Sequence, residues 1–280
     1  MRSFLRRTMV LVSAVAVGAG LTMVGVSGSA QAQATHANVL VPLYNTLNLP
    51  NWTRACSQAN GSGDGSWIIV DPHDGAGPGT APDPAYAKVI KNCYRYGRAS
   101  VIGYVATNYG RADIASVEQQ IDSYYSFYPG DIAGIFLDEV SDAVPMTTTS
   151  NQTYYQTLAS YVHKRSDNND EVVLNFGANP GSDWMLRASS AKNADIVVTF
   201  EGSYNNPSSN PYTSWQQAAW EQRYPAGDFA ALVYDAPDST ATPQPTSACS
   251  QLKQQHVGSV YVGTWFTELA PYYGQLATTC

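Results

Sequence analysis

Eight short apolar runs, each followed by a stretch of helical character, constrain the fold of this 280-residue chain more than any other feature. Runs that are apolar on both faces are typical of strands in a parallel sheet covered by helices. Eight strand–helix repeats predict an α/β fold, a single (β/α)8 TIM barrel. The predicted strands are residues 39–44, 67–71, 100–106, 132–138, 172–176, 196–200, 229–234 and 260–263.

The segments between these runs predict the helices of the outer layer. Asp113 is expected to cap the third helix and Gly97 to end the second. A doubly wound open sheet is the alternative, but it has fewer strands and often a glycine-rich phosphate loop after the first, unlike residues 44–48. No linker interrupts the pattern, so residues 36–280 are predicted to form one domain. The predicted helices are residues 52–59, 84–96, 113–127, 151–165, a short one from 183, 212–223 and 249–255.

The first 32 residues have the pattern of a secretory signal peptide. Arg2, Arg6 and Arg7 precede the apolar run 9–26, and residues 30–32 supply an A-x-A cleavage site. An uncleaved membrane anchor is the alternative, and the small and polar residues after the run argue against it. The sequence therefore predicts a secreted protein with no membrane segment after cleavage, while the export route stays open.

The remaining chain is acidic. The signal segment carries three of the 15 Lys and Arg and none of the 22 Asp and Glu, which leaves a net charge of −10. An acidic chain without a basic stripe is a poor binder of nucleic acid or anionic membranes. The acidic charge suits a neutral or cationic substrate, and the low charged fraction of 13%, with 19 Tyr and 6 Trp, fits an exported protein that handles sugars. We expect a monomer.

The four cysteines all lie in the exported part, which predicts two disulfides. Three pairings are possible, and we favour Cys56–Cys93 and Cys249–Cys280 because each joins neighbouring segments. The histidines are scattered, and no Cys/His spacing resembles a zinc site. Neither a metal nor a cofactor is predicted.

Carboxylates follow two of the predicted strands. Asp138 and Glu139 end the fourth, and Glu201 follows the sixth. Ionised carboxylates cannot lie unpaired in a buried strand, so they are expected at the carboxyl-end rim, where barrels carry their chemistry. Cleavage of a glycosidic bond needs one proton donor and one nucleophile or base, so these three are the candidate catalytic residues. The alternative is that Asp138 caps a helix and Glu139 is solvated.

Other polar and aromatic residues follow the remaining strands and are the candidate substrate-binding residues. Four of them have a structural alternative. Asp71 could form a turn and His73 could lie in a surface loop. Asn175 could tie down a loop, and Trp265 could belong to the core. The sequence contains no G-x-S-x-G, HExxH or P-loop motif. The candidates are Tyr44, Asp71, His73, Tyr104, Asn108, Asn175, Tyr234 and Trp265.

These strand-end motifs, taken in order, resemble spherulation-specific family 4 (the spherulin-4-like family), whose characterised fungal members are glycoside hydrolase family 135. The likeness spans nearly the whole exported chain. The motifs that carry it are VPLY at 41–44, DP at 71–72, GPG at 77–79, GYVATNYG at 103–110, GIFLDE at 134–139 and FE at 200–201.

The resemblance implies a TIM-barrel endo-hydrolase of α-1,4-linked N-acetylgalactosamine in galactosaminogalactan-type exopolysaccharide. The family's acidic cluster then falls on Asp138, Glu139 and Glu201. Our hypothesis is retaining hydrolysis with Asp138 as nucleophile and Glu201 as acid/base, although the sequence does not decide between Asp138 and Glu139. The alternatives are a secreted, non-catalytic polysaccharide- or wall-binding barrel and a hydrolase of another sugar, such as an α-galactoside.

Overall fold

The sheet is the core of the molecule in this computed structural model, which describes residues 38–44, 47–59, 66–77, 79–96, 99–141, 149–165, 170–186, 193–208, 210–238 and 244–279. The predicted signal peptide lies outside the described residues. Eight strands pair in parallel and in chain order. Their bounds are β1 Leu40–Tyr44, β2 Trp67–Asp71, β3 Ser100–Ala106, β4 Gly134–Asp138, β5 Glu171–Asn175, β6 Ile196–Ser203, β7 Phe229–Tyr234 and β8 Ser259–Val262.

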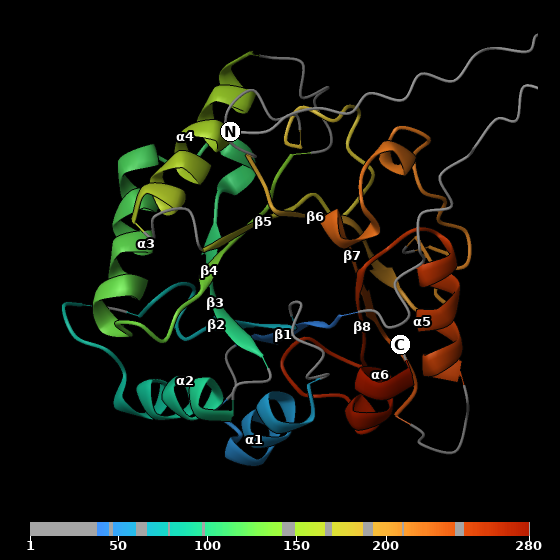
Figure 1. Cartoon of the computed structure of the whole chain (residues 1–280), viewed down its shortest axis with the longest axis horizontal. Coiled ribbons are helices and arrows are strands. Elements are labelled where there is room, and N and C mark those ends of the chain that lie inside the picture. The colour runs from blue at the N-terminus through green and yellow to red at the C-terminus, as the bar shows by residue number, and fades with distance from the viewer. Residues whose placement is uncertain are drawn as a thin grey trace, which may run out of the picture. The chain divides into compact units, whose positions relative to one another are not determined.

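The first and last strands meet, so the sheet closes on itself. The Asn38 amide donates to the Gly258 carbonyl (2.9 Å), and the Val260 amide donates to the Asn38 carbonyl (2.9 Å). Side chains reinforce the closure, because the Arg54 guanidinium donates to the Pro271 carbonyl (2.8 Å). Figure 1 looks into the ring of strands with the helices outside it. The predicted (β/α)8 barrel is confirmed.

Six α-helices in the described part of the chain cover the outside of the barrel (Figure 1). Asp113 caps α3 as predicted, its carboxylate accepting from the Ser116 amide (3.0 Å). Asn48 caps α1, so that helix begins earlier than predicted. None of the helices in the described ranges is both long and apolar enough to cross a membrane. The helices are α1 Leu49–Gln58, α2 Pro84–Tyr96, α3 Ile114–Phe127, α4 Thr149–Arg165, α5 Gln244–Gln254 and α6 Tyr273–Thr279.

The predicted helix at 212–223 is wrong. Residues 211–220 form turns and irregular chain, and within 211–223 only a 3-10 turn, η2 (Glu221–Arg223), is helical. Two tryptophans fix this segment by bonding to the loop after β5: Trp215 Nε1 donates to the Asn179 side chain (3.1 Å), and Trp220 Nε1 donates to the Pro180 carbonyl (3.0 Å). These tertiary anchors override weak local helix propensity. The short helix expected from Asp183 is a turn as far as the described residues extend.

Strand β6 is longer than predicted and irregular. It runs to Ser203, so Glu201 lies inside the strand rather than after it. Its register against β7 shifts between Val198 and Phe200, which leaves Thr199 as an extra residue. A one-residue bulge reverses the faces that the following side chains take, and such bulges are common beside active sites.

A disulfide joins the first two helices. Cys56 of α1 and Cys93 of α2 are bonded, with Cα atoms 5.0 Å apart, which confirms the first predicted pairing. The second predicted pairing, Cys249–Cys280, includes Cys280, which lies outside the described residues. The predicted helix terminator Gly97 also lies outside them.

Candidate active site

Two carboxylates share one side-chain amide at the carboxyl ends of β4, β5 and β6. Asn175 Nδ2 donates to Asp138 Oδ1 (2.7 Å) and to Glu201 Oε2 (2.7 Å). Because both oxygens lie 2.7 Å from one nitrogen, they are no more than 5.4 Å apart. The Gly177 amide donates to Asn175 Oδ1 (3.0 Å), which fixes the amide so that its NH2 group faces the acids. This is the acid–amide–acid cluster.

Glu201 is the protonatable member of the cluster. Burial of its carboxyl group, with a smaller effect of the Asp138 charge, raises its pKa from 4.5 to about 7. The hydrogen bond from Asn175 acts in the opposite direction, because it favours the ionised form. At mildly acidic pH Glu201 therefore carries a proton that it can donate.

Two tyrosines lie against the cluster from β1 and β3. The rings of Tyr44 and Tyr104 are 5.2 Å apart, and Tyr104 stacks on Phe136 at 6.2 Å. Burial and then the Asp138 charge raise the pKa of both phenols. The tyrosines thus present apolar rings whose phenols stay protonated beside Asp138.

Asp71 and Tyr234 also face the cluster. Asp71 is 4% exposed, its Oδ1 accepts from the Gly75 amide (2.7 Å), and burial raises its pKa to about 6. The pKa of Tyr234 is raised by burial and then by Glu201. The hydrogen bond of Asp71 to Gly75 fits the predicted turn role, and the buried position adds a second protonatable carboxyl near the site.

Three predicted residues lie apart from the shared amide. His73 Nε2 is 3.3 Å from Asp83 Oδ2, and His73 lines a separate pocket of about 230 Å³ under the β2–α2 loop. The Asn108 side chain is exposed. Trp265 is 59% exposed, which excludes the core alternative and leaves its ring free to contact a ligand.

Glu139 turns away from the acid–amide–acid cluster. Its carboxylate accepts a hydrogen bond from the Asn108 amide (3.1 Å) in the β3–α3 loop. Glu139, Asn108 and Tyr109 all have left-handed backbone conformations, with φ of 55°, 46° and 57°. Non-glycine residues in this region cost free energy and cluster at functional sites.

Sequence reasoning missed two residues that hold the rim, Tyr155 and Phe266. Thr107 follows the third predicted strand, so it was expected at the rim with the other residues that follow strands, and it bonds the turn after β4. Tyr155 reaches Thr107 from the middle of α4, where no sequence signal marks it. Phe266 accepts from the Tyr44 amide (2.9 Å) and lies beside the rings of Tyr44 and Tyr234 at 6.1 and 5.8 Å.

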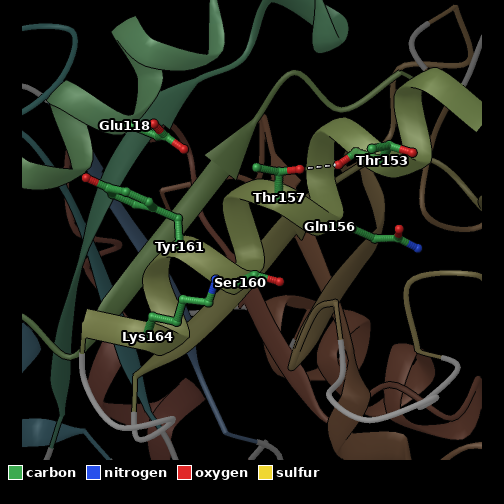
Figure 2. A pocket seen from close by; sticks show the side chains of 7 residues that line it. All are labelled: Glu118, Thr153, Gln156, Thr157, Ser160, Tyr161 and Lys164. Atoms are coloured by element: carbon green, nitrogen blue, oxygen red, sulfur yellow. Dashed lines mark hydrogen bonds between the residues drawn. The ribbon is translucent and has the colours of Figure 1, made fainter.

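A second hollow lies outside the barrel, between α3 and α4 (Figure 2). This groove of about 380 Å³ contains none of the rim residues, and Glu118 is the one carboxylate among the seven that line it. The Thr157 hydroxyl donates to the Thr153 carbonyl one turn earlier in α4 (2.8 Å). Within the described ranges, no three His, Cys, Asp or Glu residues could together hold a metal ion. The acid–amide–acid cluster is therefore the candidate active site.

A closed parallel barrel with paired acids at its carboxyl-end rim places this chain in the class of (β/α)8-barrel proteins with a rim site. More particularly, the chain belongs to spherulation-specific family 4, whose family model matches residues 38–279. This confirms the resemblance seen in the sequence. Spherulin-4 of Physarum polycephalum is 31% identical over 182 residues, or 65% of this chain and 49% of that protein. The chain thus spans about half the length of this relative.

Solved structures share the fold. The crystal structure of Aspergillus clavatus Sph3 in complex with GalNAc has a TM-score of 0.68 at 19% identity, covering 88% of this chain and 98% of Sph3. A chitinase from Bacteroides thetaiotaomicron has a TM-score of 0.52 at 9% identity, covering 87% and 95% of the two chains. At these identities the likeness concerns the barrel alone.

Proposed function

We propose that this protein is a secreted, endo-acting glycoside hydrolase that cleaves α-1,4-linked N-acetylgalactosamine in galactosaminogalactan-type exopolysaccharide, with retention of configuration. The observation that carries the proposal is the acid–amide–acid cluster, in which Asp138 and Glu201 present oxygens no more than 5.4 Å apart. Retaining glycosidases place their two carboxyl groups about 5–5.5 Å apart, and inverting ones about 6.5–9.5 Å.

In the proposed mechanism Asp138 is the nucleophile. Its carboxylate attacks the anomeric carbon while Glu201 gives its proton to the departing glycosidic oxygen, which leaves a glycosyl ester on Asp138. Glu201, now ionised, then takes a proton from water as that water attacks the anomeric carbon and releases Asp138. The raised pKa of Glu201 suits both steps, because the group is protonated below about pH 7 and is a base after the first step.

Retaining hydrolysis of an α-linked amino sugar requires a nucleophile from the protein. In that linkage the 2-acetamido group is on the same side of the ring as the leaving group at C1, so it cannot attack from the opposite face. A β-linked substrate could use its own acetamido group instead, as substrate-assisted glycosidases do. The pairing of Asp138 with Glu201 at short separation supplies the two carboxyl groups that retention at an α-linkage needs. Sph3, which shares the barrel, was crystallised with GalNAc.

The remaining rim residues have supporting roles in this proposal. Asn175 donates to Asp138 and fixes its orientation, and the phenol of Tyr104 lies beside that carboxylate. Glu139, adjacent to Asp138 in the chain, holds the β3–α3 loop by accepting from the Asn108 amide. Tyr44 and the exposed ring of Trp265 give apolar surfaces on which sugar rings can pack. Disulfides such as Cys56–Cys93 are typical of exported proteins, which supports secretion.

Reducing-end release from purified galactosaminogalactan tests the proposal. Wild type should release ends, and Asp138→Asn and Glu201→Gln should lose the activity while Glu118→Gln, in the groove of Figure 2, keeps it. NMR of the first product anomer should show the α form. A β product would replace retention with inversion, and binding without release would replace the enzyme with a polysaccharide-binding barrel.

A further inference from the structure

Thr107 connects three parts of the rim from a fully buried position. Its side chain is 0% exposed at the end of β3. Its Oγ1 lies 2.7 Å from the Asp138 carbonyl, 3.2 Å from the Glu139 carbonyl and 2.8 Å from the Tyr155 hydroxyl on α4. The Thr107 amide also donates to the Asp138 carbonyl (3.1 Å). One threonine therefore touches the backbone of both adjacent acids and the helix behind them.

The direction of the hydrogen bonds follows from counting protons. A threonine hydroxyl has one proton, and carbonyl oxygens can only accept. The Thr107 proton is therefore shared between the carbonyls of Asp138 and Glu139, and the Tyr155 hydroxyl must donate to Thr107 Oγ1. The result is a directed chain from Tyr155 through Thr107 to the Asp138–Glu139 turn.

This series of hydrogen bonds supports the Asp138–Glu139 turn, whose backbone conformation is unfavourable by itself. Glu139 is left-handed at φ 55°, and the loop that binds its carboxylate begins with the left-handed residues Asn108 and Tyr109. Thr107 also fixes that loop, because its carbonyl accepts from the amides of Gly110 (3.0 Å) and Ala112 (3.1 Å). Strained backbone of this kind persists only where surrounding contacts determine it. Thr107 supplies such contacts to both turns at once.

We infer that Thr107 and Tyr155 are positioning residues that set the place of the Asp138 carboxylate and the orientation of Glu139. The inference rests on the proposed function, for which Asp138 must meet the anomeric carbon in line with the leaving group. Neither hydroxyl touches the substrate; each acts through the peptide between the two acids. Misplacement of a reacting group by about 1 Å can reduce a rate about 100-fold.

The test compares Tyr155→Phe and Thr107→Val with two matched controls. Thr107→Ser keeps the hydroxyl and loses only a methyl group. Tyr154→Phe removes the neighbouring hydroxyl of α4, a buried group with no hydrogen-bond partner among the residues that the structure describes. Each variant is assayed for kcat and KM by reducing-end release and for its melting temperature.

We expect Tyr155→Phe and Thr107→Val to lower kcat by about 10–100-fold with KM changed less than about threefold. Thr107→Ser should restore most of the rate, and Tyr154→Phe should match wild type. A fall in melting temperature without a fall in kcat would overturn the positioning role and leave a structural one. If Tyr155→Phe does not fold, the ratio of kcat between Thr107→Val and Thr107→Ser tests the positioning role by itself. Wild type that releases no ends refutes the proposed function, whereas active wild type with all variants at its rate refutes only the positioning inference.

Discussion

Replacing Asn175 by leucine, which has a similar shape and no donor, should slow the enzyme and extend its activity to higher pH. The amide donates at 2.7 Å to both Asp138 and Glu201. A hydrogen bond to a charged group contributes about 1.5–3 kcal/mol, so losing the bond that orients Asp138 should lower the peak kcat/KM about 10–100-fold. The bond to Glu201 lowers that group's pKa, which burial has raised to about 7. Without it the pKa rises further, by about one unit for a loss of 1.4 kcal/mol.

The assay is a pH profile of kcat/KM for wild type and Asn175→Leu. The alkaline limb reports the group that must be protonated in the free enzyme. For wild type we expect this limb near pH 7, the pKa of Glu201, and for Asn175→Leu about one pH unit higher despite the lower peak. An alkaline limb that stays in place or moves down would refute the assignment of Glu201 as the acid held by Asn175.

Three further predictions concern other parts of the molecule. Glu221 is fully buried with its pKa raised from 4.5 to about 7, so the stability present below about pH 4.5 is lost as pH rises through 7. At pH 4.5 the free energy of unfolding of Glu221→Gln should therefore match that of wild type. At pH 8 it should exceed that of wild type by about 2–3 kcal/mol, measured as a higher urea midpoint; equal urea midpoints at pH 8 would contradict this. Removing the Cys56–Cys93 disulfide, which closes a span of 37 residues, should cost about 4 kcal/mol in urea unfolding; a loss below about 1 kcal/mol would show that the unfolded chain is not constrained by it. Trp265→Ala should raise KM for the polymer about tenfold, or 1.4 kcal/mol, with an unchanged melting temperature because the ring is exposed; an unchanged KM would remove Trp265 from the binding surface.

The strands and the convergence of the site could be predicted because both depend on simple rules. Runs apolar on both faces belong to parallel strands, and the carboxyl ends of parallel strands meet at one rim. Residues that end different strands, such as Tyr44, Asp138 and Asn175, were therefore expected together and lie together. The sequence separation of these residues does not predict how far apart they lie in the folded protein, whereas the barrel topology does.

The remaining features depend on tertiary contacts that no local pattern records. The bulge at Thr199 changes the face of the strand on which Glu201 lies. The alternation of apolar and polar residues along the strand does not predict this bulge. The irregular chain at 211–220 is held by tryptophan hydrogen bonds to the loop after β5. The role of Tyr155 depends on where α4 packs, so only the folded structure could bring its hydroxyl to Thr107.

The contacts that join the segment around β1 to the segment around β8 determine when the molecule can finish folding. Asn38 pairs with Gly258 and Val260, and the bond from Arg54 to Pro271 spans 217 positions. Contacts between residues this far apart form late, because the loop between them must first be ordered. A chain that emerges amino end first cannot close the barrel until β8 has appeared, and until then β1 has a free edge that can pair with other chains. A fragment that stops before β8 should therefore be prone to aggregation even though it contains all three candidate acids.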